Sequence, residues 1–382
     1  MPDFSIRIDR ASSDSTKWNK YQDHDVIPFW VADMDFAAPD FVLEALHERI
    51  DHGILGYAEP QSELVDAACK WFWHRFNWKV DPDWLIWIPG VVPGLNIASR
   101  AIGSDNDALI IMTPVYPPFL SVPETSDKQI LRSPLLYDGE KWIMDFADIG
   151  DKARLASGLL LSNPQNPTGR VYSENELSKL ANICLANDVV VVSDEIHWGI
   201  VLDEHRSHIP IASISEEFAH TTITLIASTK TYNIAGVNCA LGVIPDPILR
   251  ERFVDATTGL VSHISPLAYT ATLATFLDQS SWVNDLLAYL RVNRDLLERC
   301  VEEIPGLAMA HVEGTYLGWI DTRSLQIDDP ATFFENHGLG FSDGVDFNGE
   351  GFVRFNFACP RDLLLEGIAR LKKAASCCDM RP

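Results

Sequence analysis

The sequence predicts an α/β fold with a mostly parallel central sheet between helices, followed by a smaller α+β domain. Between about residues 85 and 280, short continuous apolar runs alternate with longer segments of helical periodicity. Continuous apolar runs are typical of parallel strands that are covered on both faces. After about residue 280 a long amphipathic segment leads into strand-like runs and a last helix, an order typical of a separate α+β unit.

The predicted strands are short runs of β-branched and aliphatic residues, as expected for strands of a buried sheet. In the large sheet they cover residues 85–88, 108–112, 158–162, 189–193, 223–228 and 239–244. In the smaller domain they cover residues 316–321 and 352–358.

The predicted helices have apolar residues at helical spacing, and several have clear start signals. Pro39 stands early in the first helix, and Ser173 precedes an acidic turn that contains Glu174 and Glu176, as is typical of helix N-termini. The predicted helices cover residues 39–50, 62–76, 95–102, 173–187, 246–257, 282–304 and 361–374.

The length of 382 residues favours two domains over one. We expect an N-terminal segment, 1–44, that packs with the small domain. A large cofactor-binding domain, 45–280, and a small C-terminal α+β domain, 281–382, complete the predicted organisation.

Composition excludes several classes of partner. The net charge of −24 argues against nucleic-acid binding, which needs a basic surface. No apolar run approaches the length of a membrane span, so no membrane partner is expected. The N-terminus lacks the apolar core of a signal peptide, and the seven cysteines are scattered, so we expect a cytoplasmic protein with free thiols. The polar stretch 204–208 lacks an H-E-x-x-H pattern, and no metal site is expected.

In an open α/β sheet, ligands bind at the carboxyl ends of the strands, so the residues after each run are the candidate site. The first run leads into Pro-Gly-Val-Val-Pro-Gly, residues 89–94, just before a predicted helix. Free amides at a helix N-terminus bind phosphate. The later runs are followed by an aromatic ring, an amide, a carboxylate, a hydroxyl and an amine. These groups belong to Tyr116, Asn166, Asp194, Ser228 and Lys230.

Lys230 is the most informative of these residues. No other lysine occurs between Lys179 and Lys372, and the turn around Lys230 is uncharged and rich in Ser and Thr. A lone amine at the end of a buried strand is poorly explained as a surface charge, whereas such an amine can lose its proton and form a Schiff base. Together with a carboxylate that keeps a pyridine nitrogen protonated, this set matches what pyridoxal phosphate requires.

Each element also has an ordinary structural explanation when it is taken alone. Gly90, Gly94 and Asn166 suit plain turns, Asp194 suits a helix cap, and Tyr116 suits packing among prolines. Their occurrence together, in strand order, favours the cofactor site over these explanations.

Motifs around these residues resemble a known family. They are Asn-Pro-Gln-Asn-Pro-Thr-Gly (163–169), Ser-Asp-Glu-Ile-His (193–197) and Ser-Thr-Lys-Thr-Tyr-Asn-Ile-Ala-Gly (228–236). With them the chain resembles the fold-type I pyridoxal-phosphate enzymes of the aminotransferase class I/II group. The resemblance runs from about residue 25 to the C-terminus and implies the aspartate aminotransferase fold.

A narrower resemblance is to the cystathionine β-lyase-like carbon–sulfur lyases of the MalY/PatB type. Its signs are Phe-Trp-Val-Ala-Asp-Met-Asp-Phe (29–36), Gly-Tyr (56–57), Asp-Glu-Ile-His (194–197) with His-Ile-Pro (208–210), and Val-Arg-Phe-Asn-Phe-Ala-Cys-Pro (353–360).

The resemblance implies roles for the residues that meet the cofactor ring. Lys230 would form the Schiff base and remove the Cα proton of the substrate. Asp194 would pair with the pyridine nitrogen, and Asn166 would bind the phenolic oxygen. Tyr116 would stack on the ring and contact the reacting substrate. His197 would also contact the cofactor, although many aminotransferases have a tyrosine there, and a structural role for His197 is an open alternative.

The resemblance also implies how phosphate and substrate are held. The backbone at Val91 and Val92, with Ser228, would bind the phosphate. Tyr57 would reach the neighbouring subunit's site in a homodimer, where it would bind cofactor and take part in catalysis. Arg354 would bind the substrate carboxylate through a bidentate fork; taken alone, its alternating strand context suits a solvated residue.

One departure concerns the phosphate. Many aminotransferases place an arginine eight residues after the Schiff-base lysine, where this chain has Asn238. That difference weakens the inference that this chain is an aminotransferase.

The resemblance implies a pyridoxal-phosphate-dependent lyase. The expected reaction is α,β-elimination of L-cystathionine or a related cysteine S-conjugate to a thiol, pyruvate and ammonia. A class I/II aminotransferase would share every cofactor residue and is the first alternative. A regulatory protein that acts through a partner surface is an alternative of another class.

Overall fold

The computed structural model describes residues 2–378 and is built around a seven-stranded sheet. The strand order is β2-β10-β9-β8-β7-β3-β4. All neighbours pair in parallel except β10, which is antiparallel to both β2 and β9. The predicted mostly parallel sheet is therefore confirmed. Its strands are β2 (Leu85–Ile88), β3 (Ala108–Thr113), β4 (Gln129–Pro134), β7 (Ala156–Ser162), β8 (Val190–Asp194), β9 (Thr222–Ile226) and β10 (Ala240–Val243).

Helices cover both faces of this sheet, which explains why its strands read as continuous apolar runs. Successive side chains of a strand point to opposite faces. In β3, Leu109 and Ile111 pack with α4 (Val91–Ala101) and α9 (Pro247–Thr257), and Ile110 and Met112 pack with α6 (Phe146–Ala153) and α7 (Glu174–Leu185). Because every position is buried, the sequence shows no polar alternation.

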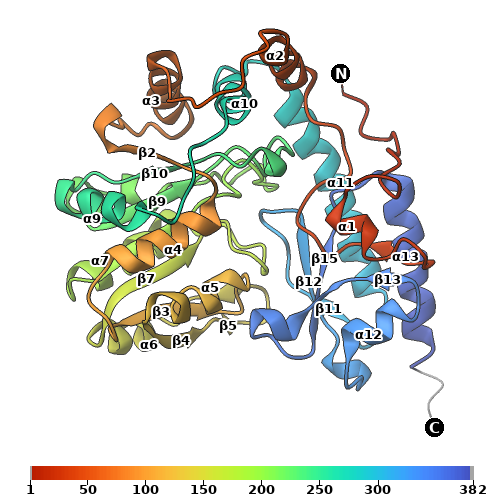
Figure 1. The fold of residues 1–382 in the computed structure, drawn as a ribbon. Coiled ribbons are helices and arrows are strands. Elements are labelled where there is room, and N and C mark those ends of the chain that lie inside the picture. The colour runs from red at the N-terminus through yellow and green to blue at the C-terminus, as the bar shows by residue number, and fades with distance from the viewer. Residues whose placement is uncertain (1, 379–382) are drawn as a thin grey trace.

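A smaller antiparallel sheet follows, in the order β11-β12-β15-β14, beside α11 and α13 (Figure 1). In addition, β1 pairs in parallel with β13. This pairing lays the N-terminal segment against the C-terminal part of the chain; the domain boundaries themselves stay a prediction. The elements are β1 (Ile27–Pro28), β11 (Ala308–Met309), β12 (Leu317–Asp321), β13 (Leu339–Gly340), β14 (Ser342–Asp343), β15 (Phe352–Asn356), α11 (Trp282–Glu302), α12 (Pro330–Glu335) and α13 (Arg361–Ser376).

The predicted helices are present, and their ends follow local signals. Ser173 caps α7 through a capping box with Glu176, a reciprocal pair that satisfies two free amides. The remaining helices and strands are α1 (Thr16–Asn19), α2 (Asp40–Asp51), α3 (Ser62–Phe76), α5 (Pro118–Ser121), α8 (Glu216–Ala219), α10 (Pro266–Phe276), β5 (Leu136–Tyr137) and β6 (Trp142–Ile143). Of these, only α2 and α3 were predicted, and β4 of the large sheet was not predicted either. Within residues 2–378, no helix combines the length and the apolar character needed to span a membrane.

One boundary differs from the prediction in a way that matters for the site. The helix predicted at 95–102 begins four residues earlier, at Val91. Gly90 and Gly94 suit a turn in the sequence, but the helix includes Gly94 and also Pro93, because proline is tolerated in the first turn of a helix, where amides lack intrahelical partners. The two residues proposed to bind phosphate, Val91 and Val92, are therefore the first two residues of α4.

Candidate active site

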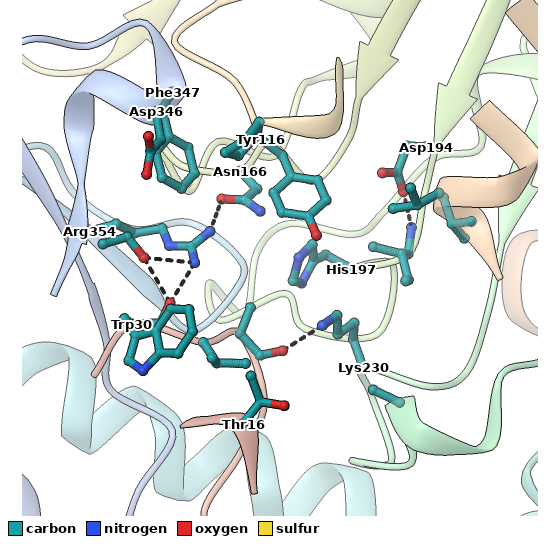
Figure 2. Close-up of a pocket in the computed structure, with 18 of the residues that line it drawn as sticks. Thr16, Trp30, Tyr116, Asn166, Asp194, His197, Lys230, Asp346, Phe347 and Arg354 are labelled. Carbon is teal, nitrogen blue, oxygen red and sulfur yellow. Dashed lines mark hydrogen bonds between the residues drawn. The ribbon is translucent and has the colours of Figure 1, made fainter. Parts of the chain in front are cut away.

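A cavity of about 730 Å³ lies at the carboxyl edge of the large sheet, between that sheet and the C-terminal part of the chain. The strands β2, β3, β7, β8 and β9 run in one direction, so the residues that follow them meet at this edge. The structure brings most of the predicted site residues together there (Figure 2). The predicted residues that line the cavity are Gly90, Val91, Val92, Tyr116, Asn166, Asp194, His197, Lys230 and Arg354, together with Asn238.

The N-terminus of α4 forms the anion-binding wall of this cavity. Gly90 precedes the helix with φ of 145° and offers no side-chain cap, a conformation that favours glycine. A Cβ on Gly94 would lie 2.5 Å from Cδ1 of Ile88 and 3.0 Å from Cδ2 of Leu225. Glycine at both positions thus lets α4 approach the sheet closely and leaves its first amides free for an anion.

Lys230 presents its amine to the cavity from the turn after β9. The Nζ atom donates to the carbonyl oxygen of Ala32 at 2.5 Å. Burial lowers the pKa of Lys230 to about 8; the charge of Arg354 acts in the same direction, while Asp33 and Asp194 oppose it. The unprotonated amine, which a nucleophile or base requires, is therefore more abundant near neutral pH than for an ordinary lysine.

Asp194 ends β8 and is buried, with one carboxylate oxygen accepting from the amide of Ile196 at 3.0 Å. Burial raises the pKa of Asp194 to about 7, against the opposing effects of that amide and of Lys230. A carboxylate in such surroundings gains most from a cationic partner, because it has lost its water. A protonated ring nitrogen is a partner of this kind.

Arg354 is a buried cation with no carboxylate within ion-pair distance among residues 2–378. Its guanidinium donates to Asn166 Oδ1 at 3.0 Å and to the Trp30 carbonyl oxygen at 2.7 Å. It also lies 4.7 Å from the ring centre of Phe347. Burial lowers the pKa of Arg354 to about 10. Its buried Nε has no hydrogen-bond partner among the described residues, and a guanidinium without a carboxylate favours an anion that enters the cavity.

The segment 29–36 supplies backbone carbonyls to both cations. The carbonyl of Ala32 also accepts from the Tyr316 hydroxyl at 3.0 Å. Asn356 holds the same segment by donating to the carbonyl oxygens of Val31 and Asp33 at 2.5 Å and 2.6 Å. The position of this segment therefore helps to determine where Lys230 and Arg354 lie.

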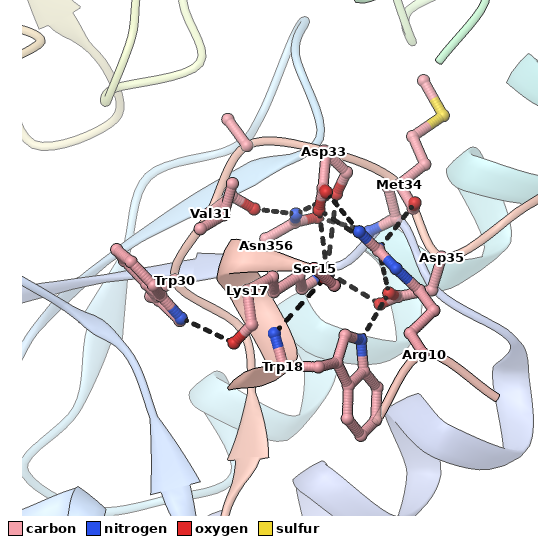
Figure 3. A network of polar contacts seen from close by, with 12 residues as sticks. Arg10, Ser15, Lys17, Trp18, Trp30, Val31, Asp33, Met34, Asp35 and Asn356 are labelled. Atoms are coloured by element: carbon pink, nitrogen blue, oxygen red, sulfur yellow. Dashed lines mark hydrogen bonds and ion pairs between the residues drawn. The ribbon is translucent and has the colours of Figure 1, made fainter. Parts of the chain in front are cut away.

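A buried ionic network anchors that segment from behind (Figure 3). Lys17 is fully buried and pairs with Asp35 at 2.7 Å. Arg10 pairs with Asp33 and with Asp35, each at 2.6 Å, and the Trp18 indole donates to Asp35 at 2.9 Å. These charges satisfy one another, so the carbonyls on the opposite side of the segment remain for the cavity.

This supporting role was not predicted. In the sequence, 29–36 is recognisable as a family signature, but no function was expected for Asp33 or Asp35. Two aspartates inside an otherwise apolar run were the available signal, because a buried carboxylate requires a cationic partner. Nothing in the local sequence pointed to Lys17 and Arg10 as those partners.

Two predicted site residues do not line this cavity. Ser228 is buried, and its hydroxyl lies 2.7 Å from that of Thr275 in α10. Thr229 lines the cavity instead, because the chain turns after β9 and directs the Ser228 side chain toward α10. Tyr57 is 94% exposed, and its ring centre lies 5.2 Å from that of His263.

His197 lies at the floor of the cavity and is neutral. Burial, with the charges of Lys230 and Arg354, lowers its pKa well below the usual value. Its ring meets Tyr316 edge-on, with centres 5.8 Å apart, and its Nδ1 has no hydrogen-bond partner among the described residues. His208, in contrast, is engaged by Glu195 at 2.8 Å and supports the structure behind the site.

Residues 24–371 match the family model described as aminotransferase class I and II. The chain belongs to this family. Cystathionine beta-lyase PatB of Bacillus subtilis is 36% identical, over 98% of this chain and all of that protein. Among solved structures of the family, OvoB is 43% identical with a TM-score of 0.95, over 98% of this chain and 99% of that one.

A further member of known structure, cystalysin from Treponema denticola, is described as containing a pyridoxal 5'-phosphate cofactor. It is 32% identical, with a TM-score of 0.95 over the whole of both chains. These similarities confirm the predicted family and the fold-type I architecture, in which a mostly parallel sheet is flanked by helices.

Proposed function

We propose that this protein is a pyridoxal-phosphate-dependent carbon–sulfur β-lyase, which converts L-cystathionine or a related cysteine S-conjugate to a thiol, pyruvate and ammonia. The observation that carries the proposal is the convergence of the Lys230 amine, the buried Asp194 and the unpaired Arg354 on one cavity. The names of the relatives support this reaction over other reactions of the family.

The donor set fits the cofactor. The free amides of Val91 and Val92 suit its phosphate, and Asp194 suits its ring nitrogen. The amine of Lys230 suits reaction with the cofactor's aldehyde, and the ring of Tyr116 lines the cavity. Asn166 keeps its amide nitrogen for the phenolic oxygen, since its Oδ1 accepts from Arg354. When bound, pyridoxal phosphate supplies an electron sink for charge that develops at Cα.

Residues of the chain have separate roles in the elimination. Arg354 binds the substrate carboxylate and so orients the Cα–H bond. Lys230, with its pKa near 8, takes the Cα proton as general base. The neutral His197 adds no further positive charge beside Lys230, so it does not lower the pKa of that amine further, and the amine stays basic enough to accept a proton.

We propose a homodimer in the cytoplasm, with Tyr57 reaching the partner's cavity. Exposed apolar side chains support the proposed dimer. Ile54, Leu55, Tyr57 and Leu260 are each more than half exposed, as is typical of residues in protein interfaces. Sedimentation at micromolar concentration should give twice the chain mass of 42.7 kDa, and a monomer at that concentration would contradict the dimer.

The deciding assay is pyruvate release from L-cystathionine in the absence of any keto acid. A lyase produces pyruvate and a free thiol in equal amounts. The alternative from the same family, an aminotransferase, would produce no pyruvate under these conditions and would transfer the amino group to an added keto acid. The latter result would replace the lyase assignment.

The pH dependence of cofactor uptake follows from the lowered pKa of Lys230. Only the unprotonated amine reacts with an aldehyde, so the rate should rise with pH and level off above about pH 8. An ordinary lysine, with a pKa of about 10.4, would still gain reactivity well beyond that point. Mixing apoprotein with pyridoxal phosphate across this range, followed by absorbance, measures the rate; no plateau below about pH 10 would contradict the lowered pKa.

A further inference from the structure

The lining of the cavity also includes polar and charged residues besides those proposed to meet the cofactor. These residues, called the outer wall here, are Thr16, Lys20, Glu335, Asp343 and Asp346. In Figure 2, Asp346 and Phe347 lie beside Arg354, at the end of the cavity opposite Asp194. A substrate whose carboxylate is bound by Arg354 therefore lies near Asp346.

The carboxylates of the outer wall differ in how they are engaged. Glu335 already has a cation, since Lys20 lies 3.4 Å away, and it accepts from the Tyr21 hydroxyl at 2.8 Å. Asp343 accepts from the amide of Val345 at 3.1 Å and so caps the short turn Gly344–Phe347. Lys20 is therefore neutralised by Glu335. Asp343 caps a turn but pairs with no cation within residues 2–378.

Asp346 has neither a cation nor a hydrogen bond among residues 2–378. It is an exposed residue of the cavity lining. Together, Asp343 and Asp346 give the outer wall a negative charge that no described residue neutralises.

A second, independent observation points to the ligand. Arg354, 4% exposed and without a carboxylate partner among residues 2–378, lines the same cavity. The cavity therefore has an uncompensated cation inside and uncompensated anions in its outer wall. A molecule that matches this pattern has a carboxylate at one end and a positive charge at the other.

We propose that Asp346, assisted by Asp343, selects cysteine S-conjugates whose sulfur substituent carries a cationic group. The proposal rests on the lyase function proposed above and names the substrate class of that site. The inner carboxylate of such a substrate binds Arg354, and the cationic end of its sulfur substituent lies against Asp346. Conjugates with a neutral substituent lose this contact, and those with an anionic substituent are repelled.

A matched set of substrates tests this selection in the holoenzyme. S-(2-aminoethyl)-L-cysteine and S-propyl-L-cysteine have substituents of the same size, and S-(2-carboxyethyl)-L-cysteine supplies the negative charge. Pyruvate release gives kcat/KM for each. Because the thiols differ as leaving groups, the decisive quantity is how the ratio of aminoethyl to propyl substrate changes between the wild type and Asp346→Asn.

We expect Asp346→Asn to lower this ratio about fivefold, mainly through KM, which is the size of effect for an ion pair near solvent. Glu350→Gln is the matched control, because Glu350 is a nearby exposed carboxylate that does not line the cavity. It should leave the ratio unchanged. An unchanged ratio in Asp346→Asn, or an equal drop in Glu350→Gln, would overturn the proposal.

The same experiment separates this proposal from the lyase assignment. Pyruvate from all conjugates with no effect of Asp346→Asn on the ratio refutes the charge selection and leaves the lyase standing. If no conjugate yields pyruvate, the lyase assignment fails. In that case, the binding affinities of the aminoethyl and propyl compounds are measured through the absorbance of the bound cofactor. The ratio of these two affinities, compared between the wild type and Asp346→Asn, then tests the charge selection.

Discussion

Replacing Lys230 with alanine is expected to lower pyruvate release from L-cystathionine by about 10⁴-fold or more. General-base catalysis alone contributes roughly 10²- to 10⁴-fold, and this variant also loses the amine that binds the cofactor covalently. Kinetics at saturating cofactor measure the effect. Reductive trapping with borohydride provides a second readout, because the variant should no longer retain pyridoxal phosphate on the peptide that contains position 230.

Lys230→Ala removes one hydrogen bond without leaving its acceptor unpaired. The Ala32 carbonyl that Lys230 contacts also accepts from the Tyr316 hydroxyl, so it keeps a hydrogen bond when the amine is removed. We therefore expect thermal unfolding close to that of the wild type. Lys179→Ala, which removes an exposed amine on α7, is the matched control and should retain activity. Pyruvate release from Lys230→Ala within tenfold of the wild type would refute the catalytic role.

Replacing Arg354 with alanine is the second large effect that we expect. Truncating one member of a buried charge pair costs about 2–5 kcal/mol, so kcat/KM for L-cystathionine should fall by roughly 30- to 5,000-fold. Arg354→Lys keeps a charge but loses the planar fork and should recover only part of the loss. Steady-state kinetics with separate kcat and KM values measure both variants.

A substrate lacking the carboxylate supplies the control for Arg354. The carboxamide of S-propyl-L-cysteine cannot form the ion pair, so wild type and Arg354→Ala should process it with similar kcat/KM. A loss in the variant that is as large with the amide as with the acid would mean that Arg354 acts through Asn166, Trp30 and Ser342, which it contacts, and not through the substrate.

Much of the fold could be predicted because its signals are local. The helix expected at 62–76 is α3 (Ser62–Phe76), and the strand expected at 85–88 is β2. The large-sheet strand β4 was missed because its residues are mostly exposed or half-buried and include Arg132 and Pro134, so it lacks an apolar run. The helix α10 was missed because it has apolar residues around its whole circumference and no clear period.

The sequence by itself determined which groups meet at the large sheet. Apolar runs make parallel strands, parallel strands end at one edge, and the residues after them, including Asn166, Asp194 and Lys230, therefore converge. Only the tertiary structure decided how those groups are held. The contact of Lys230 with Ala32 spans 198 residues, and that of Arg354 with Trp30 spans 324.

Charge balance was likewise decided by the tertiary structure. Within the described part of the chain, Arg354 pairs with no carboxylate and Asp346 with no cation, because of which segments fold beside them. Local propensity and periodicity describe neighbours within a few residues, whereas ion pairing depends on side chains brought together by packing over the whole chain. For this reason the convergence of Asn166, Asp194 and Lys230 on one cavity could be predicted from the sequence. The pattern of unpaired charges that we propose for substrate selection could not.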